Sequence, residues 1–151
     1  MADPARLEVA VGLMVTLPGV PMIFAGDELG LEGVNGEDSR RPMPWHRPES
    51  WDRATLERYR ALLGVRAGSA ALRRGGLRWA HVDDDTLCFL RETPDERVLV
   101  LARRAAGVPV RLSGFGAAGA ENVYGGATVP CGDGSVLLPA DGPTLQIWTI
   151  S

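Results

Sequence analysis

The sequence contains no lysine, and its 16 basic residues are all arginine. Acidic residues exceed them in number, which gives a net charge of −3 at neutral pH. A chain with this balance lacks the excess of positive charge that binding to nucleic acid or to an anionic membrane surface requires. We therefore expect neither of these partners.

Cysteine is also scarce. Cys88 and Cys131 lie far apart and do not have the spacing of metal ligands, which favours two reduced thiols. No apolar run approaches the roughly 18 residues of a membrane-spanning helix, and the first residues do not read as a signal peptide. The sequence thus predicts a soluble, cytoplasmic protein, and nothing in it indicates a metal or a cofactor.

The chain is long enough to form a substantial core, because 45% of its 151 residues are hydrophobic. Asp3 and Pro4 are a typical helix start. The segment Arg6–Thr16 that follows reads as a helix with apolar residues nearly all round. Such a helix is buried, or it has a partner on more than one face.

The segment Val20–Ala25 is a continuous apolar run, which suits a strand of a parallel sheet covered on both faces. It leads into a charged stretch that ends at Trp45. A loop beyond roughly 12–15 residues is usually functional or disordered, and its apolar and proline residues argue against disorder. We predict a strand that opens into a binding loop, followed by a helix that begins near Ser50 or Asp52 and one further turn over Ala70–Arg74.

From Leu77 onward, short β-type runs alternate with turn residues, as in an antiparallel sandwich or barrel. The predicted strands are Leu77–Val82, Thr86–Glu92, Arg97–Arg103, Val108–Leu112, Glu121–Tyr124, Ser135–Leu138 and Thr144–Ile150. We place Trp79, Phe89 and Trp148 in the core of this sandwich. The run Asp83–Asp85 predicts a solvated hairpin turn, because it lacks the other ligands of a calcium loop. A domain boundary near Gly75 divides the chain into residues 1–75 and 76–151.

The stretch LPGVPMIFAGDELGLEGVNGEDSRRPMPW, Leu17–Trp45, resembles the α-amylase family of glycoside hydrolases, in the branch of cyclomaltodextrinases, neopullulanases and α-glucosidases. The resemblance implies an α+β fragment: the last strand and flanking helices of a (β/α)8 TIM barrel, followed by an all-β antiparallel C-terminal sandwich. It also implies retaining cleavage or transfer at α-glucosidic bonds of malto-oligosaccharides, so the expected partner is an α-glucan oligosaccharide. A complete barrel needs about 250 residues, far more than precede the β-rich part here.

By the family pattern, the catalytic carboxylates lie on earlier barrel strands, the last of them in an Asn-His-Asp-type motif that should precede Pro4. No such motif occurs in the chain. We therefore assign no catalytic residue and expect the chain to be inactive alone.

The resemblance points to substrate-binding residues instead. Arg40 matches an arginine that binds sugar near the non-reducing end of the cleft. A guanidinium offers five donors to sugar hydroxyls. An ion pair of Arg40 with Glu37 or Asp38, which would shape the loop, is an equally good interpretation. Asp38 is a second candidate, within Asn35–Ser39, where relatives of this type tend to read Asn-Asp-Pro-Asp-Cys.

Asp27, Glu28 and Trp45 complete the candidate site. Adjacent residues that leave a strand point to opposite faces, so Asp27 and Glu28 are not an acid and nucleophile pair. We interpret them as acceptors that fix the loop, with one of them able to face the site. Trp45 could stack on a sugar ring, although a buried anchor is the favoured interpretation.

Two further interpretations stay open. The chain could be a non-catalytic carbohydrate-binding or structural module that packs on a partner. It could also pair with a separate polypeptide that carries the missing barrel portion, or self-associate, through the apolar N-terminal helix.

Overall fold

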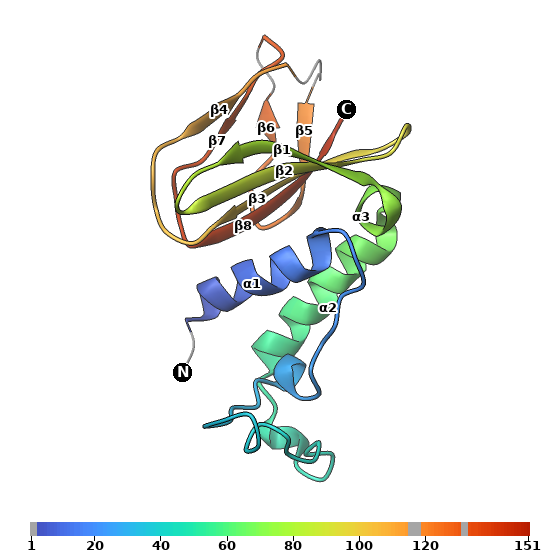
Figure 1. The fold of residues 1–151 in the computed structure, drawn as a ribbon, viewed down its shortest axis with the longest axis vertical. Helices are drawn as coiled ribbons and strands as arrows, with labels where there is room; N and C mark the ends of the chain where they lie inside the picture. Colours follow the sequence, from blue (N-terminus) through green and yellow to red (C-terminus); the bar gives the residue numbers. More distant parts are fainter. Residues whose placement is uncertain (1–2, 115–118, 131–132) are drawn as a thin grey trace.

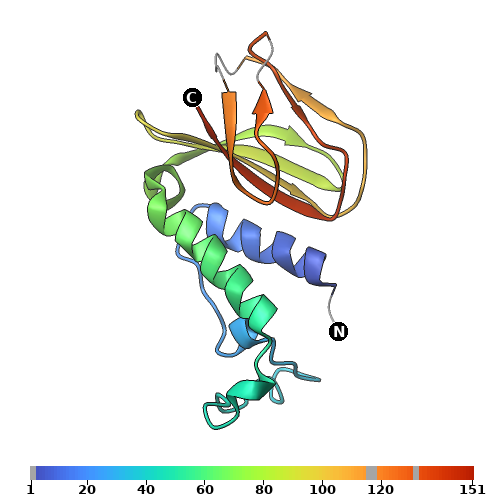
Figure 2. The same cartoon turned by 180° about the vertical axis from the view of Figure 1, so that it is seen from behind.

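The computed structural model describes residues 3–114, 119–130 and 133–151, so Cys131 lies outside the described residues. Helices pack on one face of an antiparallel sheet, and a smaller sheet covers the other face (Figure 1). A long loop extends from the end of the helical layer that lies away from the sheets, as the reverse view in Figure 2 also shows. Within the described ranges, no helix is long and apolar enough to cross a membrane.

The first two helices begin at the capping residues that the sequence predicts. Asp3 accepts a hydrogen bond from the N–H of Ala5 at the start of α1 (Pro4–Thr16). Asp52 does the same for Thr55 in α2 (Arg53–Gly68), and Ser69 for Leu72 in α3 (Ala70–Arg74). A side-chain oxygen at this position satisfies an N–H group that has no partner inside the helix. Two short 3-10 helices, η1 (Asp27–Leu29) and η2 (Pro48–Ser50), lie before α2.

The strands also follow the prediction, and every pair is antiparallel. The larger sheet has the order β1-β2-β3-β8-β5-β6, and the smaller one pairs β4 with β7. The strands are β1 (Gly76–Val82), β2 (Thr86–Glu92), β3 (Arg97–Arg103), β4 (Val110–Leu112), β5 (Gly119–Tyr124), β6 (Val129–Pro130), β7 (Val136–Leu138) and β8 (Thr144–Ile150). The sequence did not predict β6, because a two-residue strand that includes proline has no alternating pattern to recognise.

The central strands of the larger sheet are buried on both faces. One core lies between this sheet and the helices and contains Val11, Leu62 and Phe89. The other lies between the two sheets and contains Leu101 and Trp148. The prediction that Phe89 fills the sandwich core was therefore wrong, since its ring faces the helices. The predicted boundary near residue 75 falls between α3 and β1, and the first core includes residues from both sides of it.

Trp79 is not a core residue either. It lies on the edge strand β1, its side chain is 51% exposed, and its ring meets that of Phe89 edge-on with centroids 5.5 Å apart. The Asp83–Asp85 turn is confirmed: the N–H of Asp83 donates to the carbonyl of Thr86, which closes the hairpin between β1 and β2.

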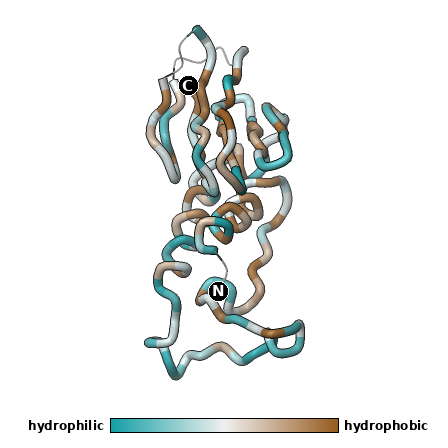
Figure 3. The backbone as a smooth tube through the Cα atoms, turned by 90° about the vertical axis from the view of Figure 1, so that its left-hand side faces the viewer, coloured by the Kyte–Doolittle hydropathy of each residue, from teal (hydrophilic) through white to brown (hydrophobic). Residues whose placement is uncertain are grey.

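The predicted strand Val20–Ala25 is absent, and this prediction was wrong. Val20 is 94% exposed and Met22 is 78% exposed, and the backbone of this segment pairs with no strand of the described residues. A parallel strand requires a hydrogen-bonded neighbour and a cover on both faces. Neither is provided by the described part of the chain. Figure 3 shows hydrophobic stretches in the helices and sheets and along the extended segment that leads into the loop, whereas the loop at the far end is mostly hydrophilic or neutral.

Two helix glycines give a matched test of this packing. A Cβ added at Gly12 in α1 would collide with the side chain of Leu145, which is buried in the sheet below. A Cβ added at Gly64 in α2 would meet no atom within 4 Å. We expect Gly64→Ala to raise the free energy of unfolding by about 1 kcal/mol, because alanine favours the helix. We expect Gly12→Ala to lower it by about 1–3 kcal/mol, because the core must shift.

Urea denaturation followed by circular dichroism measures both changes. Shifts of the same sign in the two variants would contradict the close approach of α1 to β8.

Candidate functional site

The candidate loop, residues 27–45, is fixed at its base to the start of α2. Leu29 is buried, and its carbonyl accepts a hydrogen bond from the N–H of Asp52 at 3.0 Å. Gly26 has a φ of 102°, a conformation that favours glycine, and its carbonyl accepts from the N–H of Leu31. The base is therefore an ordered structure built on α2.

Glu28 fixes this base, as the sequence predicts. Its Oε2 accepts a hydrogen bond from the N–H of Gly26 at 3.0 Å. Asp27, its neighbour in η1, is exposed. Burial raises the pKa of the nearby Tyr59, and the charges of Asp27 and Glu28 raise it further.

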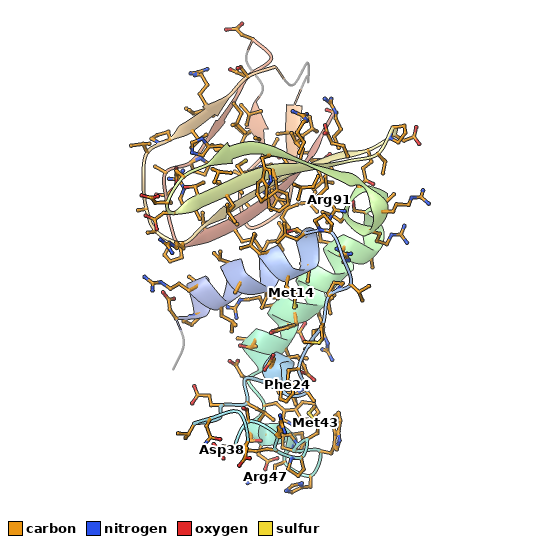
Figure 4. The ribbon with its side chains drawn as sticks, in the orientation of Figure 1. Met14, Phe24, Asp38, Met43, Arg47 and Arg91 are labelled. Atoms are coloured by element: carbon orange, nitrogen blue, oxygen red, sulfur yellow. The ribbon has the colours of Figure 1, made fainter. Side chains whose placement is uncertain are left out.

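Asp38 organises the middle of the loop. Its Oδ2 accepts hydrogen bonds from the N–H of Val34 at 2.9 Å and from Nη2 of Arg41 at 2.6 Å. Asn35 supports the same turn, since its Oδ1 accepts from the N–H groups of Glu37 and Asp38. The hydrogen bond from Arg41 lowers the pKa of Asp38. Figure 4 shows Asp38 at the end of the molecule farthest from the sheets.

Arg40 does not make the ion pair that one interpretation gave it, because its neighbour Arg41 pairs with Asp38 instead. The backbone N–H of Arg40 donates to the carbonyl of Glu37. Its side chain is exposed and has no hydrogen bond or ion pair with the described residues. All five guanidinium donors are therefore available to a ligand. The pairing of Arg41 was missed because a turn, unlike a helix, has no fixed side-chain periodicity.

Trp45 is 69% exposed, so it is not the buried anchor that the sequence favoured. Its ring lies edge-on to that of Trp51, with the centroids 5.9 Å apart and the planes at 77°. Trp51 is the fixed member of the pair: its Nε1–H donates to the carbonyl of Pro44 at 3.1 Å, and the guanidinium of Arg53 lies 4.8 Å from its ring centroid. Trp45 thus presents an exposed indole beside an ordered one.

The loop carries exposed groups of three kinds on an ordered base. These are an unpaired guanidinium at Arg40, a carboxylate at Asp27 and an indole at Trp45. A guanidinium and a carboxylate can exchange hydrogen bonds with hydroxyl groups, and an indole face can pack against C–H groups. The described residues include no group of three or more His, Cys, Asp or Glu side chains that could hold a metal ion. The arrangement suits recognition of a polyhydroxylated ligand.

No family model matches the chain. A search of characterised proteins finds neopullulanase 2 of Thermoactinomyces vulgaris, 36% identical over 101 residues, which cover 66% of this chain and 17% of that protein. It also finds the mouse amino acid transporter heavy chain SLC3A2, 30% identical over an alignment covering 85% of this chain and 27% of that protein. The chain therefore spans only about a quarter or less of the length of these relatives.

Among solved structures, an Anoxybacillus α-amylase matches with a TM-score of 0.88 at 23% identity, over 97% of this chain and 32% of that one. This likeness shows the fold. Cyclomaltodextrinases and a maltogenic α-amylase are further sequence relatives. Fold and sequence agree: the chain belongs to the α-amylase family and matches the C-terminal region of those enzymes.

Proposed function

We propose that this chain forms the C-terminal part of a glycoside hydrolase that cleaves or transfers α-glucosidic bonds of malto-oligosaccharides with retention. We also propose that its candidate loop contacts the sugar. The observation that carries the proposal is the pairing of Arg41 with Asp38, because it leaves Arg40 exposed and unpaired in the same loop that carries the exposed indole of Trp45. The similarity to neopullulanase 2 supports the substrate class.

The loop residues divide into two roles. Arg40 donates to sugar hydroxyls, Asp27 accepts from them, and Trp45 packs on a ring face. Glu28 and Asp38 already accept hydrogen bonds from the backbone, so they hold the loop in shape and offer only their remaining lone pairs. A retaining glycosidase needs two carboxyl groups about 5–5.5 Å apart on either side of the bond. Glu28 is engaged with Gly26, so the proposal places the catalytic pair outside these 151 residues.

The purified 151-residue chain should therefore release no sugar from maltotriose or p-nitrophenyl α-glucoside, since binding groups alone do not supply the acid and the nucleophile. A chromogenic and a chromatographic assay measure this. Turnover that Arg40→Ala abolishes would contradict the proposal, and the same turnover in both chains would indicate a contaminating enzyme.

The binding of maltoheptaose should depend on the side chain of Arg40 more than on that of another exposed arginine. We expect Arg40→Ala to weaken the binding of maltoheptaose about tenfold, the loss of roughly one charge-assisted hydrogen bond. Arg60→Ala is the matched control, because Arg60 is an exposed arginine on α2 that pairs with Glu57 at 2.7 Å. Isothermal titration calorimetry compares the two. If both variants bound maltoheptaose with equal affinity, Arg40 would not be a sugar-binding residue.

A second candidate function is that of a non-catalytic module that packs on a partner. The match to a protein named as a transporter heavy chain favours it, as do the exposed apolar residues Val20, Met22 and Phe24. The apolar helix α1 already packs against the sheet and α2, whereas this extended segment offers an exposed apolar surface to a missing barrel portion or to a second copy.

If that surface is an interface, the chain should self-associate in solution, and the triple change Val20→Ser, Met22→Ser, Phe24→Ser should reduce the association by removing exposed apolar area. Sedimentation velocity over a range of concentrations measures it. A wild-type chain that stays monomeric throughout would argue against self-association.

A further inference from the structure

Three arginines of the described chain are buried and bind main-chain carbonyl groups instead of carboxylates: Arg66, Arg91 and Arg103. A buried charge is costly unless hydrogen bonds compensate it. Arg103 binds the carbonyls of Val108 and Ala140 at one end of the sandwich. Arg66 and Arg91 lie side by side, and they bind a different set of carbonyl groups.

Arg66 and Arg91 hold the last turn of α1 from two directions. Arg66, on α2, donates from Nη1 to the carbonyl of Val15 at 2.6 Å. Arg91, on β2, donates from Nη1 to the carbonyl of Thr16. The last turn of α1 contains no basic residue of its own. The final carbonyls of a helix lack partners and carry partial negative charge. These two guanidinium groups therefore stabilise the turn, because they provide hydrogen-bond donors and positive charge.

Arg66 also reaches beyond the helix. Its Nη1 contacts the carbonyl of Leu17 at 3.3 Å, and its Nη2 donates to that of Gly19 at 2.5 Å. After Gly19, the segment Val20–Ala25 pairs with no strand of the described residues. Ile23 packs against the core, and the carbonyl of Phe24 accepts a hydrogen bond from the N–H of Asp27 at the base of the candidate loop. One end of this segment is thus tied to the last turns of α2 and the other to its start. Figure 4 shows Arg91 at the junction of sheet and helices, with Phe24 farther along toward the loop.

We propose that Arg66 is a positioning residue for the candidate loop: by holding the carbonyls of Val15, Leu17 and Gly19, it sets where the segment that leads into the loop leaves the helical layer. The part of this inference that concerns sugar rests on the proposed function. A lysine cannot replace Arg66, because one ammonium group cannot span three carbonyls as the planar guanidinium does. Burial and the nearby charge of Arg66 lower the pKa of Arg91, which agrees with the two groups sharing one site.

The test compares Arg66→Lys with Arg103→Lys. Both remove a guanidinium that binds carbonyls and keep a positive charge, but only Arg66 touches the approach to the loop. In hydrogen exchange followed by mass spectrometry, Arg66→Lys should speed exchange in peptides that cover residues 18–31 at least tenfold. Peptides from β2 and β3 should keep the protection they have in the wild type. Arg103→Lys should leave residues 18–31 unchanged and speed exchange around Val108 and Ala140.

Titration with maltoheptaose supplies the functional readout. Arg66→Lys should weaken binding about tenfold while Arg103→Lys does not. Unchanged exchange over residues 18–31, or unchanged affinity in a chain whose wild type binds, would overturn the inference. Loss of protection throughout the sheet, both in Arg66→Lys and in the uncharged Arg66→Gln, would overturn it too, by assigning Arg66 to general stability. A wild type that does not bind maltoheptaose contradicts the proposed function, and the exchange comparison then decides the role of Arg66 by itself.

Discussion

The contact between two buried guanidinium groups and the last turn of α1 is the constraint on which the arrangement of this molecule depends. Arg91 of β2 also donates to the carbonyl of Gly75, so it joins the end of α1 to the point where the helices give way to the sheet. Arg66 joins that turn to α2. The helical layer and the larger sheet are thus held at one shared corner. Packing alone would position them less strictly, because apolar contacts have no preferred direction.

This contact between the helical layer and the larger sheet fixes the helices in place because the sheet is rigid. Its central strands β3 and β8 are buried on both faces, with residues such as Val100 and Ile147 toward the helices and Leu101 and Trp148 toward the smaller sheet. A structure packed on both sides resists displacement of any one residue. The polar contact of Glu8 with Arg58 at 3.1 Å adds a tie between α1 and α2 away from the corner. The loop is therefore carried by elements that cannot shift easily against one another.

Much of this fold could be predicted from the sequence, because it depends on local signals. The strands over Thr86–Glu92, Arg97–Arg103 and Thr144–Ile150 have alternating or continuous apolar runs between clear turns, and their predicted bounds match the structure. The caps at Asp3 and Asp52 are equally local.

The errors have a common physical cause, which is that they depend on a partner distant in sequence. Val20–Ala25 has the composition of a buried strand, but a strand exists only where another backbone pairs with it. Phe89 and Trp148 both read as core residues, and only the register of β2 and the packing of α1 decide which face each ring occupies. The buried roles of Arg66 and Arg91 gave no signal, because their ligands are backbone carbonyls, which every residue has.

The hydrogen bonds within the candidate loop limit the chemistry that the loop can perform. Two of its carboxylates, those of Glu28 and Asp38, accept hydrogen bonds from backbone N–H groups of the loop. The hydrogen bond from Arg41 lowers the pKa of Asp38, so this carboxyl group is poorly suited to general acid catalysis. The groups left free, at Arg40, Asp27 and Trp45, can orient a ligand but cannot form the opposed pair that cleavage of a glycosidic bond needs. The geometry of the loop therefore favours recognition over chemistry, and the proposed reaction would take its carboxylates from elsewhere.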